Sequence, residues 1–130
     1  DAIEFIETSA SERRELTSFH VAICDLKTDE VIGMIGLNII NHPHKRAEVG
    51  YWIAEEYWGT GMMLEALNLM VDYYFENMKL ERIYAFVIPD NIPSWKLLEK
   101  AGFEREGLLK GLMRKEGKRY DHYIYARLKG

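Results

Sequence analysis

The chain has 130 residues, 48% of them hydrophobic, and a formal net charge of −4. This length suits one hydrophobic core and is too short for two ordinary domains, and the mixed charges contain no basic patch of the kind that binds nucleic acid. A single cysteine excludes a disulfide framework, and neither a long apolar run nor a signal-peptide pattern is present, so we expect a cytoplasmic protein with no membrane partner.

The first half of the chain predicts a meander of strands. Residues 1–18 begin with a short apolar segment and continue into a polar stretch, 9–15, that fits either a short helix or a loop. FHVAICDL and VIGMIGLNII are rich in β-branched and apolar residues and are separated by a turn at 27–30, which predicts two antiparallel strands. After a polar loop, AEVGYWI predicts a third strand.

The second half alternates between helices and strands. Apolar residues recur at helical spacing from 62 to 78 and predict an amphipathic helix. RIYAFVI predicts a fourth strand, and Asn91 is a suitable N-cap for a second helix, SWKLLEKAGF. The tail fits two more strands around a turn at 116–117. This order predicts one α/β domain, a mixed sheet with helices packed on it.

Two glycines precede the first predicted helix, in EYWGTGMMLEALNLM. Gly59 and Gly61 follow a strand, and the N-terminus of a helix presents unpaired N–H groups and a positive dipole end. A pyrophosphate approaches the backbone closely only where no Cβ intervenes, so the turn suits phosphate binding. The alternative is that the glycines only make a tight connection. The spacing fits neither a P-loop nor G-x-G-x-x-G, so a nucleotide triphosphatase or a dinucleotide dehydrogenase is not supported.

Two motifs together resemble the GNAT N-acetyltransferase superfamily, most closely its branch of ribosomal-protein N-terminal acetyltransferases. The similarity covers residues 19–130, a core with both acetyl-CoA motifs, and 1–18 are an incomplete N-terminal region. The first motif of the family, Arg/Gln-x-x-Gly-x-Gly/Ala, matches at Gly61 but has Trp58 and Met63 at its other two positions. The second motif matches at Asn91, Ser94, Glu99, Lys100, Gly102 and Phe103.

The resemblance implies acetyl-CoA as cosubstrate, bound by the strand end, the glycine turn and the start of the second helix. The residues expected to bind it are Trp52, Ile53, Ala54, Trp58, Gly59, Thr60, Gly61, Met62, Met63, Asn91 and Ser94. Ser94 would hydrogen-bond the leaving sulfur, or else only cap its helix. Glu48 in AEVGYW would be the general base, or else a solvated strand glutamate or one that holds the substrate cation. The histidines lack metal-ligand spacing, so no metal is expected.

The branch usually has an extra strand and a helix before the meander, and we expect the first strand to be missing here. An exposed sheet edge would then favour a homodimer. Three functions remain open at this point: acetylation of a protein N-terminal amine, acetylation of a small amine such as a polyamine, an amino acid or an aminoglycoside, and a non-catalytic acyl-CoA-binding module. Similarity of fold does not choose among acceptors.

Overall fold

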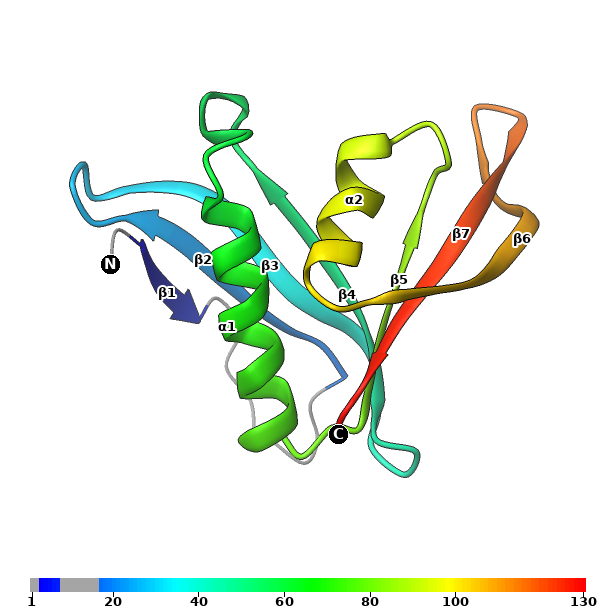
Figure 1. Cartoon of the computed structure of the whole chain (residues 1–130), viewed down its shortest axis with the longest axis horizontal. Coiled ribbons are helices and arrows are strands. Elements are labelled where there is room, and N and C mark those ends of the chain that lie inside the picture. The colour runs from blue at the N-terminus through cyan, green and yellow to red at the C-terminus, as the bar shows by residue number, and fades with distance from the viewer. Residues whose placement is uncertain (1–2, 8–16) are drawn as a thin grey trace.

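The computed structural model describes residues 3–7 and 17–130, which form a seven-stranded sheet and two α-helices (Figure 1). Neighbouring strands are antiparallel except β4 and β5, which are parallel, and the order across the sheet is β1-β2-β3-β4-β5-β7-β6. The predicted mixed α/β fold is therefore confirmed.

The elements in chain order are β1 (Ile3–Glu7), β2 (Phe19–Asp25), β3 (Glu30–Asn41), β4 (Arg46–Ile53), the 3-10 turn η2 (Glu55–Tyr57), α1 (Met62–Glu76), β5 (Arg82–Val87), α2 (Ile92–Lys100), β6 (Glu104–Lys115) and β7 (Lys118–Leu128).

Element boundaries follow the sequence signals closely. Helix α1 ends at Glu76, two residues before the predicted end, and Lys79 beyond it has a positive φ of 60° that no helix continues through. Helix α2 begins after Asn91, whose side chain accepts a hydrogen bond from Ser94 N, as an N-cap residue does. No helix among the described residues is long and apolar enough to cross a membrane.

The N-terminal segment differs from the prediction. Ile3–Glu7 form β1, which pairs antiparallel with β2, from Ile3 opposite Asp25 to Glu7 opposite Val21. The expectation of a missing first strand is therefore wrong, and β1 rather than β2 forms this edge of the sheet. The apolar IEFI segment supplies the β-branched and aromatic residues that favour this strand. The polar stretch 9–15, for which a helix or loop was expected, lies outside the described residues.

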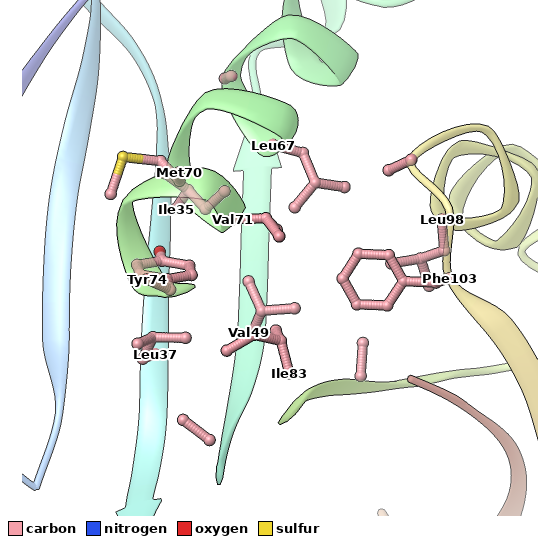
Figure 2. Close-up of a cluster of buried hydrophobic side chains, with 14 of the residues drawn as sticks. Ile35, Leu37, Val49, Leu67, Met70, Val71, Tyr74, Ile83, Leu98 and Phe103 are labelled. Carbon is pink, nitrogen blue, oxygen red and sulfur yellow. The ribbon is translucent and has the colours of Figure 1, made fainter. Parts of the chain in front are cut away.

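Both helices pack on one face of the sheet, with a continuous core beneath them (Figure 2). Figure 2 shows side chains from α1 and from α2 meeting those of the central strands. The β4 residues Ala47 and Val49 are buried on this face, whereas Arg46 and Glu48 alternate to the other face, as the pleat of a strand requires. The fully buried side chains include Ile35, Leu37, Leu67, Val71, Ile83 and Leu98.

The two central strands separate near their middle. β4 and β5 pair only from Arg46 opposite Arg82 to Glu48 opposite Tyr84. β4 continues to Ile53 and β5 to Val87 without pairing with each other, and in Figure 1 they diverge toward the top of the view, with α2 in front of the gap. We call this gap the β4–β5 opening. It leaves strand edges unpaired in the middle of the sheet, where a ligand is able to pair with them.

The buried hydroxyl of Tyr74 leads to a prediction about the stability of the protein. Its hydroxyl is buried and has no hydrogen-bond partner among the described residues, and burial raises its pKa. An unsatisfied buried hydroxyl opposes folding, so Tyr74→Phe is expected to raise the free energy of unfolding by about 1 kcal/mol. Urea denaturation of the two proteins measures the difference. A clear loss of stability would show that the hydroxyl is satisfied.

Candidate active site

Strand β4 presents a different group to each face of the sheet at the β4–β5 opening. Tyr51 lies on the helix-covered face with Val49, and Glu48 lies on the opposite face, between Asn38 of β3 and Tyr84 of β5. The last paired position of β4 and β5 is that of Glu48. A thioester held in the opening would therefore have a carboxylate toward one face and hydroxyl groups toward the other.

Helix α2 places Ser94 beside β4. The hydroxyl of Tyr51 lies 3.0 Å from Ser94 Oγ and 3.4 Å from Ser94 O, across the opening. Ser94 occupies the first turn of α2, where Asn91 Oδ1 accepts from its backbone N–H at 3.4 Å. Asn91, not Ser94, caps the helix, so the Ser94 hydroxyl is left to interact across the opening.

The backbone at the end of β4 is partly used by the protein itself. Ala54 N–H donates to Ile32 O at 2.7 Å, and Ala54 O accepts from Tyr57 N–H. Because hydrogen-bonding groups alternate along an antiparallel strand, Trp52 also faces β3, whereas the backbone of Ile53 faces the opening. Of the three residues at this strand end that were predicted to bind acetyl-CoA, Ile53 is thus the one whose N–H faces the opening.

The glycine turn leads from β4 into α1. Gly59 and Gly61 have φ values of 75° and 85°, a region that favours glycine, and Gly61 is the N-cap of α1 without any capping side chain. A Cβ built on either residue meets no atom within 4 Å, so open space adjoins the backbone. Thr60 Oγ1 accepts from Met62 N–H at 3.3 Å. The other first N–H groups of α1 have no partner within the helix, which fits a phosphate group.

The two departures from the family motif have structural explanations. The side chain of Met63 is buried in the core under α1, so it does not occupy the space beside the glycines. The indole N–H of Trp58 donates to Ile53 O at 2.8 Å, which joins the glycine turn to the end of β4. Trp58 is 66% exposed and offers a flat apolar surface beside the turn. Neither residue blocks the helix start.

A second contact holds the turn from its other side. Tyr57 OH donates to Asp25 Oδ2 at 2.9 Å, at the end of β2. Hydrogen bonds from Lys27 N–H and from Tyr57 keep the pKa of Asp25 below its usual range, so Asp25 stays an acceptor at neutral pH. The turn is therefore fixed to β2 as well as to β4.

Glu48 combines partial burial with a shifted pKa. Desolvation of the half-buried carboxyl raises its pKa above the usual value. A carboxylate with a raised pKa is a stronger base, which suits proton transfer from an amine near neutral pH.

Helix α2 is anchored on its far side by Arg105 of β6. The guanidinium lies 3.8 Å from the ring centroid of Tyr123 and 5.1 Å from that of Trp95, next to Ser94 in sequence. Arg105 Nε also donates to Tyr125 OH at 2.9 Å, and that hydroxyl donates to Glu99 of α2. These contacts fix α2 against β7 and so fix the position of Ser94.

Of the predicted site residues, Glu48 and residues 52–53 lie on β4 with residue 54 directly after it, residues 58–63 lie in and just after the turn that follows, and Asn91 and Ser94 lie at the start of α2, which the Tyr51–Ser94 contact joins to β4. Tyr51 was not predicted as a site residue. The alternation of β4 carried the signal, because it puts Tyr51 on the same face as Ala47 and Val49. Within the described residues no group of three His, Cys, Asp or Glu side chains is placed to hold a metal ion.

Comparison with known proteins extends over most of the chain. The family described as acetyltransferase (GNAT) domain matches residues 1–104. An uncharacterized N-acetyltransferase, p20 of Bacillus licheniformis, is 43% identical over 103 residues, which are 79% of this chain and 58% of that protein. The [ribosomal protein uS5]-alanine N-acetyltransferase of Escherichia coli is 31% identical over 111 residues, 85% of this chain and 57% of the relative. The chain thus spans little more than half the length of these two relatives.

Solved structures agree with the sequence comparison. The ribosomal-protein-S5-alanine acetyltransferase of Vibrio fischeri has a TM-score of 0.81 at 32% identity, covering 86% of this chain and 62% of that one. A spermidine N-acetyltransferase chimera of the Vibrio cholerae enzyme SpeG and hSSAT also has a TM-score of 0.81, at 29% identity over 88% of this chain and 69% of that one. The resemblance seen in the sequence is confirmed, and the chain belongs to the GNAT acetyltransferase family.

Proposed function

We propose that the protein is an N-acetyltransferase that moves the acetyl group of acetyl-CoA to a primary amine by direct attack in a ternary complex. The observation that carries this proposal is the β4–β5 opening, which has Glu48 toward one face and the Tyr51–Ser94 pair toward the other. The glycine turn continues from the same strand to the start of α1, where a phosphate fits. Family membership supports the same chemistry.

In the proposed reaction each side chain has a separate task. Glu48 takes a proton from the acceptor ammonium or from the attacking amine, directly or through water. The amine nitrogen forms a bond to the acetyl carbon, the carbon–sulfur bond breaks, and the sulfur leaves with the electron pair of that bond. Ser94 donates a hydrogen bond to this sulfur, the thiolate takes a proton from water as CoA leaves, and Glu48 releases its proton to solvent. The backbone N–H at Ile53 is the group we assign to the thioester carbonyl, as an oxyanion donor.

For the acceptor we favour a protein N-terminal amine, as in the ribosomal-protein acetyltransferases among the relatives. Beside Glu48, on the face away from the helices, Arg46, Arg82, Tyr84 and Ile124 line an open cavity of about 280 Å³. Arg82 is paired with Glu106 at 2.6 and 2.9 Å, and Arg46 is exposed. Because Glu106 offsets the charge of Arg82, Arg46 is the cation of this cavity that disfavours a polyamine with several positive charges.

A small amine is the second candidate, because solved spermidine acetyltransferases share the fold at 29% identity. A thiol-release assay with acetyl-CoA, run against peptides with free N-termini, spermidine, amino acids and an aminoglycoside, separates the candidates. Turnover confined to peptides supports the first, and turnover confined to small amines the second. Calorimetry with acetyl-CoA alone completes the test: tight binding with no turnover on any amine would identify a non-catalytic acyl-CoA-binding module, and no binding would refute both enzymatic functions.

The role of Ser94 carries its own prediction. Ser94→Ala is expected to lower kcat by about tenfold or more, because the leaving thiolate loses its hydrogen bond. Steady-state thiol-release kinetics measure the change. Lys96→Ala, on the exposed side of the same helix, is the control for helix integrity and should leave kcat within about twofold. An unchanged rate in Ser94→Ala would leave the serine with no catalytic part.

A further inference from the structure

The contact between Tyr51 and Ser94 joins two elements that the sheet itself does not connect at this point. Tyr51 lies on β4 beyond its last pairing with β5, and Ser94 lies in the first turn of α2, 43 residues later in the chain. The phenol is half-buried and its ring packs against the core. Its hydroxyl lies 3.0 Å from Ser94 Oγ, a pair in which either oxygen is able to donate, and it donates to Ser94 O at 3.4 Å.

The serine hydroxyl needs such a partner in order to have one orientation. A serine side chain rotates among three staggered positions, and the helix cap of Asn91 constrains the backbone N–H of Ser94, not its hydroxyl. The hydrogen bond of that cap is long, at 3.4 Å. Among the described contacts, the Tyr51 hydroxyl is the one that meets Ser94 Oγ.

We propose that Tyr51 is a positioning residue: its hydroxyl donates to Ser94 Oγ and so turns the serine's own proton toward the leaving sulfur. This inference rests on the proposed acetyltransferase function. Tyr51 itself does not touch the reacting atoms in this scheme, and it transfers no proton. When Ser94 Oγ accepts a hydrogen bond from Tyr51, the hydroxyl hydrogen of Ser94 is free to be donated to a second acceptor. In the reaction that acceptor is the thiolate.

The alternative is that Tyr51 is a core tyrosine and that its hydrogen bond with Ser94 only satisfies the phenol hydroxyl. Three features favour the positioning role. The partner is the side chain that the second family motif places at the sulfur, the contact crosses the opening where acetyl-CoA is proposed to bind, and α2 is held in place from its other side by Arg105. Burial also raises the pKa of Tyr51, so the phenol keeps its proton throughout the neutral range and remains a donor.

A double-mutant cycle tests the proposal. Tyr51→Phe is expected to lower kcat about 3- to 10-fold with KM for acetyl-CoA within about twofold, because the serine loses its orientation and the ligand keeps its contacts. In a Ser94→Ala background the same change should alter kcat by less than about twofold. Tyr74→Phe removes the same hydroxyl from a tyrosine in the core under α1 and should leave kcat unchanged in both backgrounds.

Two kinetic results would overturn the proposal: equal losses of kcat on Tyr51→Phe in both backgrounds, or a raised KM with kcat unchanged.

A second measurement does not depend on turnover. A hydrogen bond with Ser94 favours one protonation state of Tyr51 over the other, so in Ser94→Ala that tyrosine should ionise at a different pH, followed by NMR of ring-labelled tyrosine and assigned with Tyr51→Phe. An unchanged titration would refute the contact. If the wild type releases no thiol with any amine while this shift is present, the acetyltransferase proposal fails and the contact stands.

Discussion

Replacing Gly61 by alanine is expected to weaken acetyl-CoA binding about tenfold or more, equivalent to ~1.4 kcal/mol or above. Gly61 has a φ of 85° and stands at the N-cap of α1. A Cβ there meets no protein atom within 4 Å, so it projects into the space that we assign to the phosphates. The methyl group would hold a phosphate away from the backbone N–H groups. Isothermal titration with acetyl-CoA measures the loss.

A matched control separates lost binding from backbone strain. Gly117, in the turn between β6 and β7, has a φ of 79° and equally open space around a Cβ. Alanine at either position is strained by the left-handed backbone, at about 1 kcal/mol. Gly117→Ala should therefore lose similar stability in urea denaturation and keep its affinity for acetyl-CoA. Equal affinity losses in the two variants would mean that Gly61 does not adjoin the ligand.

Much of this fold was open to prediction because its signals are local. Helix α1 follows from apolar spacing and α2 from Asn91, whose cap the structure confirms. The strand between them, β5, is rich in β-branched and aromatic residues. The N-terminal strand was missed because IEFI is short and stands alone, and its assignment depends on pairing with β2, which is a tertiary contact that propensity does not encode.

The candidate site was predictable as a set of residues, and less so as an arrangement. The glycines were predicted from their place before a helix, and the resemblance supplied Glu48 and Ser94, because motif spacing is visible in a sequence. The Tyr51–Ser94 contact was not visible, because it depends on where β4 and β5 stop pairing and on the placement of α2 against β7. The hydrogen bond from the Trp58 indole N–H to Ile53 O was not predictable from the sequence either. It gives Trp58, which departs from the family motif, a structural role in holding the turn.

Replacing Glu48 by glutamine is expected to lower kcat about 100-fold or more, which is the usual contribution of a general base. Glutamine keeps the size and hydrogen-bonding capacity of the side chain and removes its ability to accept a proton at neutral pH. Steady-state kinetics with the best acceptor of the panel measure the effect. Glu104→Gln, an exposed change on β6, is the matched control and should leave kcat within about twofold.

The pH dependence distinguishes a base from a glutamate that only binds the substrate cation. Desolvation raises the pKa of Glu48, so the wild-type kcat should fall on acidification at a pH above the ordinary range of about 4.3 for glutamate. The basic form is the ionised one, so activity is present above that pKa and is lost below it. In Glu48→Gln this acid limb should disappear with the same acceptor, because the amine titrates identically in both reactions. A residual limb at the same pH would assign the titration to another group, and a raised KM with an unchanged kcat profile would make Glu48 a binding residue.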